Sequence, residues 1–313
     1  MSNHDPNNSR LVNSIGETMK AMIRCAVFLI LSGTLGLASE NDLVCIPEGV
    51  LGGIDEDFGV VCITNSKTLL MDRTEVTQSL WLEIYNWALT NGYEFSSDVN
   101  RVGANGSNYP VHAVTFGVAV LWCNARSEKN GLVPCYINSA GTGIKKYSES
   151  ISRCALSASG FRLPTPREWE YAARGLTSTR FHWGNTISYS NANFTGWTNR
   201  YEVSTIAGRA HPVFSKGKNL NVLGDAATSP VMSFPPNRFG LYDMSGNVSE
   251  WCWDDNEASS RWKITKGGSW RTSPESLRPG SIEYLEGGGQ HVWAFNSTGF
   301  RCVRVQGDRD HDF

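Results

Sequence analysis

The chain has 313 residues, a formal net charge of -2, 40% hydrophobic residues and 19% charged residues. This balance favours a globular protein over a disordered one. A nearly neutral sequence without a basic stripe gives no sign of a nucleic-acid partner. The 31 glycines and 11 tryptophans, without long helical periodicity, indicate a loop-rich fold with short strands.

The N-terminal segment has the pattern of an export signal. Lys20 and Arg24 precede an apolar run at Cys25–Leu31, and small residues follow up to Ala38. The run is short of the roughly 20 residues that span a bilayer. We therefore expect export to the periplasm or the extracellular space, with no membrane span once the signal is removed. An uncleaved N-terminal anchor is the alternative.

The rest of the chain gives no internal repeat and no convincing linker. We expect residues 1–38 to be a signal peptide or a non-native leader, because Met19 or Met22 is an alternative start. Residues 39–307 should form a single domain, and residues 308–313 an acidic tail.

Three helices are predicted by their capping residues. The alternating segment Asp42–Arg73 reads as short strands and turns. Thr77 then caps a helix that runs to about Leu89, and Thr115 caps a second helix that stops at Gly131. The third begins at Thr165, where Pro166 occupies the first helical position and Glu168 completes a capping box, and it ends at Gly175.

The second half of the chain is irregular. The Ser- and Gly-rich segment 137–159 reads as a surface insertion, and no long periodicity survives in 176–233. So long a loop is uncommon in a compact domain, so we interpret it as functional or held by an ion. Strand-like runs return at Tyr242 and in three longer segments, Val248–Trp253, Ile264–Trp270 and Phe300–Val305.

Seven phrases in this order resemble the formylglycine-generating enzyme family, also called sulfatase-modifying factors. They are RTEVT from Arg73, YPVHAVT from Tyr109, LPTPREWEYAARG from Leu163, FHWGN from Phe181, PPNRFGLYDMSGNVSEW from Pro235, KGGSW from Lys266 and GFRCVR from Gly299. Several collinear motifs are far more specific than any one of them. The resemblance implies a mixed α+β fold with little regular secondary structure, related to C-type lectin domains, and it implies bound calcium.

A calcium site is expected in the run from Asp243 to Glu250. Its two carboxylates bracket carbonyls on a glycine-containing turn, and calcium takes six to eight oxygen ligands. The resemblance assigns the ion to Asp243, Glu250 and the carbonyls of Gly246 and Val248. The alternative is that the two acids are only turn and strand-edge residues.

The resemblance implies a second calcium site that begins at an Ala-Asn-aliphatic phrase. Asn193 and the carbonyl of Phe194 match that phrase here. The acidic partner should lie just before Pro230, and the nearest acid, Asp225, departs from the family's spacing.

The expected catalytic cysteines are missing. In catalytic members of the resembling family, two cysteines in the loop after the GGS-aromatic phrase hold Cu(I), for which thiolates are natural ligands. Thr272 and Leu277 occupy those two positions here. A hydroxyl and an isobutyl group do not replace two thiolates, so copper is not expected.

Eight cysteines remain to be placed, and Cys25 falls inside the export signal. The resemblance implies a disulfide between Cys123 and Cys302. Spacing alone suggests two further pairs, Cys135 with Cys154 and Cys45 with Cys62, and it leaves Cys252 as a buried thiol.

Other candidate site residues have ordinary interpretations. The scattered histidines show no metal-ligand spacing, and each reads first as a structural residue. The alternative is that His112, His182 and His291 reach one pocket. Seven tryptophans suit either core packing or a groove for sugar or peptide. They are Trp183, Trp197, Trp251, Trp253, Trp262, Trp270 and Trp293.

Three functions remain open on these residues. The first is an exported, calcium-stabilised module that binds or assembles a protein, peptide or glycan and lacks oxidase activity. The second is an oxidase that converts a substrate cysteine to formylglycine, and the third is another enzyme that uses the same pocket. Because a fold does not fix a function, the choice depends on the surroundings of Thr272 and Leu277.

Overall fold

The computed structural model describes residues 42–195, 227–254, 262–286 and 296–307. The predicted export signal, the acidic tail and Asp225 lie outside these residues. The described part is a mixed α+β fold with short elements, as predicted. In chain order the elements are β1 (Leu43–Ile46), β2 (Gly49–Asp55), β3 (Gly59–Asn65), β4 (Leu69–Asp72), α2 (Gln78–Thr90), the 3-10 helix η2 (Ser97–Arg101), α3 (Phe116–Lys129), β5 (Tyr136–Ile137), β6 (Arg153–Cys154), α4 (Pro166–Arg174), β7 (Ser249–Cys252), β8 (Trp262–Lys266), β9 (Glu283–Glu286), β10 (Thr298–Gly299) and β11 (Val303–Val305).

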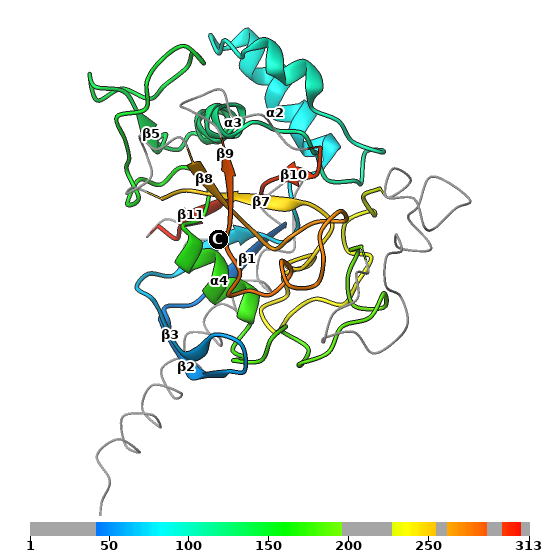
Figure 1. Cartoon of the computed structure of the whole chain (residues 1–313). Coiled ribbons are helices and arrows are strands. Elements are labelled where there is room, and N and C mark those ends of the chain that lie inside the picture. The colour runs from blue at the N-terminus through cyan, green and yellow to red at the C-terminus, as the bar shows by residue number, and fades with distance from the viewer. Residues whose placement is uncertain (1–41, 196–226, 255–261, 287–295, 308–313) are drawn as a thin grey trace, which may run out of the picture.

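Two small sheets form the centre of the fold, and the first joins segments from both ends of the chain. In the first, β4 lies between β1 and β11, and both pairings are antiparallel. The second has the order β10-β7-β8-β9, in which β10 pairs with β7 in parallel. Figure 1 shows α2 and α3 side by side at one end of the molecule, and the β2–β3 hairpin near α4 at the other.

The three predicted helices form, and each begins at the predicted cap. The hydroxyls of Thr77 and Thr115 accept the backbone N–H groups of the third helical residues of α2 and α3. At α4 the capping box is complete, because Thr165 accepts from the Glu168 N–H and Glu168 accepts from the Thr165 N–H. Gly175 ends α4 in the left-handed conformation, with φ 53°.

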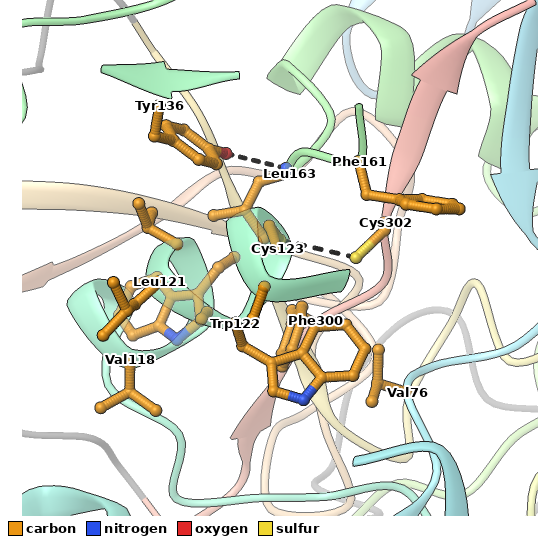
Figure 2. Close-up of a cluster of buried hydrophobic side chains, with 14 of the residues drawn as sticks. Val76, Val118, Leu121, Trp122, Cys123, Tyr136, Phe161, Leu163, Phe300 and Cys302 are labelled. Atoms are coloured by element: carbon orange, nitrogen blue, oxygen red, sulfur yellow. Dashed lines mark hydrogen bonds between the residues drawn. The ribbon is translucent and has the colours of Figure 1, made fainter. Parts of the chain in front are cut away.

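The largest hydrophobic cluster lies between α2, α3 and the sheets. Trp122 stacks on Trp81 with ring centroids 5.8 Å apart, and it meets Phe300 edge to face at 5.3 Å. Figure 2 shows Phe300 of the C-terminal segment packed against Trp122 of α3. This contact buries the GFRC phrase against α3.

The predicted strands are shorter than expected. The run predicted from Ile264 to Trp270 is β8 only as far as Lys266, because Gly267 and Gly268 adopt φ of 86° and 63° and turn the chain away. The insertion predicted at 137–159 is tied at its base by β5 and β6, with Tyr136 opposite Cys154. In the described residues 176–195 there is no helix and no strand beyond isolated bridge residues, so the irregular interpretation is confirmed for that part.

The three predicted disulfides are not present in the structure. The sulfurs of Cys123 and Cys302 lie 3.5 Å apart as buried thiols (Figure 2), too far for the ~2.05 Å of an S–S bond, so their bridge stays a prediction. The suggested pairing of Cys45 with Cys62 is wrong here. Cys62 is a free, exposed thiol opposite Gly52 in the hairpin, whereas Cys45 pairs with Leu70 in another sheet.

The suggested bridge between Cys135 and Cys154 is also not formed in the structure, where both residues are buried and neither takes part in a disulfide. Cys154 lies opposite Tyr136 in the β5–β6 pair, and the Cys135 thiol donates to the carbonyl of Gly160 at 3.2 Å. Cys252 is a buried thiol of β7, as predicted. Within the described ranges, no helix is long and apolar enough to cross a membrane.

Candidate functional site

The predicted calcium-binding run folds into a tight turn before β7. Asp243, Gly246 and Asn247 have φ of 56°, 83° and 62°, a left-handed conformation that Asp, Asn and Gly tolerate best. A Cβ on Gly246 would lie 2.3 Å from the carbonyl oxygen of Asn193. Only glycine therefore allows the Asn193 segment to pack against this turn.

Asp243 presents one carboxylate oxygen without a partner. Its Oδ2 accepts the backbone N–H of Met232 at 2.8 Å, while its Oδ1 is buried and accepts no hydrogen bond. Burial raises the pKa of Asp243 from 3.8 to about 6. A buried carboxylate oxygen without a donor is costly unless a proton or a cation satisfies it.

Glu250 lies at the start of β7, in a buried ion pair. Arg301, from the GFRC phrase, donates to both of its oxygens, through Nε at 2.7 Å and Nη2 at 2.7 Å. Trp169 of α4 donates its indole N–H to Oε2 at 2.6 Å. Arg301 also donates to the carbonyls of Tyr242, Asp72 and Arg73. Residues from separate phrases of the sequence, Trp169 and Arg301, therefore both donate to the carboxylate of Glu250.

A third carboxylate, Glu75 of the RTEVT phrase, completes this buried group and was not predicted from the sequence. Its Oε1 accepts the backbone N–H of Val248 and its Oε2 accepts from the side chain of Asn247, both at 3.2 Å. Burial, together with the charges of Asp243 and Glu250, raises the pKa of Glu75. Since 173 residues separate Glu75 from Val248, no local pattern signals the contact.

The chemistry of these donors fits calcium better than a transition metal. Within the described ranges, no three His, Cys, Asp or Glu side chains are close enough to hold a metal by themselves. A site that combines two carboxylates with backbone carbonyls is typical of calcium. The unpartnered Oδ1 of Asp243 offers one such ligand, and Glu250 retains a lone pair beyond its three donors. Three buried carboxylates face one guanidinium, so the local charge favours a cation.

Asn193 and Phe194, the candidates for a second calcium site, have packing roles. The side-chain amide of Asn193 donates to the carbonyl of Ala227 at 2.9 Å, and its own carbonyl accepts the N–H of Asn247 at 2.8 Å. Phe194 is buried in a small apolar cluster and contacts Tyr189. Their position against the Gly246 turn brings the two predicted sites next to each other.

Thr272 and Leu277 converge although neither is a thiol. A Cβ on Gly268 would meet both the Thr272 hydroxyl and a Leu277 methyl at 2.7 Å. The Thr272 hydroxyl accepts the N–H of Ser269 at 2.8 Å and donates to the carbonyl of the same residue at 3.1 Å. Leu277 is fully buried in an apolar cluster with Phe194. The two side chains therefore fill the site with apolar and locally bonded atoms.

The described histidines pack against neighbouring residues. His112 packs against Gly103, and His182 contacts Trp183 edge to face at 4.6 Å. Burial lowers the pKa of His182 from 6.5 to about 4, so it is neutral at physiological pH. Trp251 and Trp253 belong to the core, as their ordinary interpretation predicted. His291, Trp197 and Trp293 lie outside the described residues.

A cleft that the sequence did not predict opens beside the start of α2. It has a volume of about 330 Å³. Asp42, Thr77 and Glu83 line it together with Glu75, which is almost fully buried. Glu75 thus lies between this cleft and the carboxylates of Asp243 and Glu250.

Known proteins are similar to this chain in sequence and in fold. The chain is 29% identical to the chaperone protein LppX of Paenibacillus barcinonensis, over 80% of this chain and 90% of that protein. It is 36% identical to a formylglycine-generating enzyme of Thermomonospora curvata, over 41% of this chain and 38% of that protein. It is 34% identical to the inactive C-alpha-formylglycine-generating enzyme 2 of Bos taurus, over 47% of this chain and 45% of that protein.

Solved structures agree. The crystal structure of CarF has a TM-score of 0.62 and 27% identity, and covers 85% of this chain and 98% of its own. PvdO from Pseudomonas aeruginosa, with a TM-score of 0.53 and 20% identity, shares the fold; the match covers 84% of this chain and 94% of its own. The family model for the sulfatase-modifying factor enzyme 1-like domain matches residues 38–306. The chain therefore belongs to this family, which includes the formylglycine-generating enzymes.

Proposed function

We propose that this chain is an exported, calcium-stabilised member of the family that binds or assembles a protein, peptide or glycan and lacks the oxidase chemistry. The observation that carries the proposal is the pair Thr272 and Leu277, which converge on Gly268 where a thiol pair would be needed. Cu(I) binding requires soft ligands. A fully buried leucine and a hydroxyl bonded within its own loop supply none.

Two relatives support a role without oxidation. One is named a chaperone and resembles this chain over most of both lengths. Another is named inactive, although it shares a third of the aligned residues. A scaffold that keeps its core phrases and loses the reactive pair is expected to keep a binding surface, because function is a property of the site and not of the fold.

The decisive experiment is an oxidase assay on the purified, signal-free chain. The chain is incubated with copper, oxygen, a reductant and a cysteine-containing sulfatase-type peptide, and mass spectrometry detects any aldehyde. An active family member is the positive control. We expect no aldehyde from the folded chain. Aldehyde formation would overturn the proposal, and would require copper ligands other than residues 272 and 277.

Calcium binding is tested by thermal unfolding in EDTA and in added calcium. A ligand that binds only the native state stabilises it by about 2.7 kcal/mol at a hundredfold excess over Kd, so the midpoint should rise by several degrees. Asp243→Asn should remove most of this response, because it weakens the ligand at the unpartnered Oδ1. The exposed Glu48→Gln is the matched control and should respond like the wild type. A wild-type midpoint that is insensitive to calcium would exclude the site.

Export is tested separately by expressing the full chain and fractionating the cells. We expect a mature N-terminus near residue 39 in the periplasmic or extracellular fraction, because the charged, apolar and small-residue regions are those of a cleaved signal. An intact N-terminus in the membrane fraction would instead support the uncleaved anchor.

A further inference from the structure

Asn247 contacts four segments that are distant in the sequence. Its N–H donates to the carbonyl of Asn193 at 2.8 Å, and its carbonyl accepts the N–H of Trp270 at 2.9 Å. Its side chain accepts the N–H of Ser229 at 2.9 Å and donates to Glu75 at 3.2 Å. The residue is almost fully buried. Every polar group of Asn247 except one amide hydrogen is thus used to join separate parts of the chain.

The orientation of the Asn247 amide is fixed by its partners. A backbone N–H, that of Ser229, must face the amide oxygen, so the amide nitrogen must face Glu75. Glu75 in turn accepts the N–H of Val248 with its other oxygen. The carboxylate therefore bonds to two consecutive residues of the turn, one through its side chain and one through its backbone.

We propose that Glu75 and Asn247 form a clamp that positions the carbonyl of Gly246 for a cation and couples cation binding to the loop that carries Thr272 and Leu277. Glu75 acts here as a positioning residue and not as a ligand. The clamp rests on the proposed calcium site, and it assigns to the RTEVT phrase a task that the sequence did not reveal.

The geometry gives the clamp its physical basis. Asn247 holds φ of 62°, which costs free energy in a residue other than glycine and is maintained only by its surroundings. The carbonyl of Gly246 and the N–H of Asn247 belong to the same peptide unit. The hydrogen bonds that hold the conformation of Asn247 therefore also set the direction of the Gly246 carbonyl. The Val248 N–H shares a peptide unit with the Asn247 carbonyl, so its bond to Glu75 and the bond from Trp270 to that carbonyl hold this unit at both ends.

The coupling to the loop follows from two further bonds. The N–H of Trp270 donates to the Asn247 carbonyl, and the carbonyl of Trp270 accepts from the Thr195 hydroxyl at 2.8 Å. The N–H of Thr195 donates to the carbonyl of Thr272 at 3.1 Å. A cation that stabilises the turn should therefore also stabilise the loop that carries Thr272.

A reversal of the hydrogen bond tests the clamp without changing its net charge. In the Glu75→Gln/Asn247→Asp double variant, the new amide donates to the new carboxylate. The amide oxygen at position 75 still accepts from Val248, and the carboxylate at position 247 still accepts from Ser229. Each single variant instead loses the donor–acceptor match, and their charge changes are opposite. Exposed Asn86→Asp in α2 is the control for an amide-to-acid change.

Calcium affinity is measured by titration calorimetry on EDTA-stripped protein, and the loop by hydrogen exchange of peptides covering 266–278, with and without calcium. We expect each single variant to weaken calcium binding about tenfold or more and to lose the calcium-dependent protection of the loop, because a buried group is left mispaired. The double variant should recover both to near the wild-type values, and Asn86→Asp should change neither.

The outcomes separate the clamp from the cation site itself. If the wild type binds no calcium, the proposed cation site fails, and the role of the clamp in it fails too. If the wild type binds calcium and Asn247→Asp binds it more tightly while Glu75→Gln binds it less tightly, charge alone governs the site and the clamp is overturned. A double variant that remains as weak as the single variants also overturns it.

Discussion

Replacing Arg301 with methionine removes a guanidinium whose charge acts on Glu75, Asp243 and Glu250. Methionine keeps an unbranched side chain in the buried space but donates no hydrogen bond. The change removes two bonds of 2.7 Å to Glu250 and the bonds to three backbone carbonyls. Both Arg301 and Glu250 are fully buried, so water does not replace the lost donors.

The expected loss is large because the partner charge stays buried. Removing one member of a buried ion pair costs about 3–5 kcal/mol. Total stabilities are about 5–15 kcal/mol, so the variant loses a large fraction of its margin. For a domain of this size, the loss corresponds to a midpoint lower by roughly 10 °C. Calcium should reduce the loss, since a bound cation supplies positive charge to the same carboxylates.

The assay is urea unfolding of Arg301→Met and wild type in EDTA, repeated in calcium. Arg167→Met, at an exposed position of α4, is the control and should change the free energy of unfolding by less than about 0.5 kcal/mol. A loss below about 1 kcal/mol for Arg301→Met in EDTA would refute the reasoning. It would mean that the buried carboxylates are protonated or hydrated, and do not depend on the guanidinium.

Three further predictions concern the turn, a histidine and the cysteines. Gly246→Ala should lower the free energy of unfolding in urea by at least about 2 kcal/mol, because its Cβ would approach the Asn193 carbonyl to 2.3 Å. Gly92 is the control, since it has the same φ of 83° but open space around it, and Gly92→Ala should lower the free energy of unfolding clearly less. Equal losses in the two variants would contradict a role for the Asn193 contact. Burial lowers the pKa of His182 from 6.5 to about 4. As the pH falls, His182 is therefore protonated in the unfolded chain at a higher pH than in the folded one. Stability should fall by up to about 3 kcal/mol as pH drops from about 6.5 to about 4, and His182→Gln should remove that part of the pH dependence; an unchanged profile would contradict it. In an oxidising compartment we expect a Cys123–Cys302 disulfide, found by non-reducing peptide mapping and worth about 4–5 kcal/mol, whereas two alkylated thiols in the exported protein would exclude it.

Local sequence determined the helices and their ends. The capping box at Thr165 and Glu168 forms between residues three positions apart, so the bonds that begin α4 are visible in the sequence. The left-handed ending at Gly175 is equally local. The collinear phrases also identified the family and the α+β fold, as the family model and the CarF structure confirm.

Only the tertiary structure decided how the site is built. It placed Glu75 against Val248, Arg301 against Glu250 and Asn247 against Trp270, and it separated Cys62 from Cys45. Most of these contacts join residues that are far apart along the chain. A charged or amide side chain in water is compatible with many partners, and only its burial in the fold restricts it to one. The sequence alone determined which residues were present at the candidate site, including the loss of both thiols. The packing of distant segments determined which of those residues meet, because a buried polar group must find its partner within the fold.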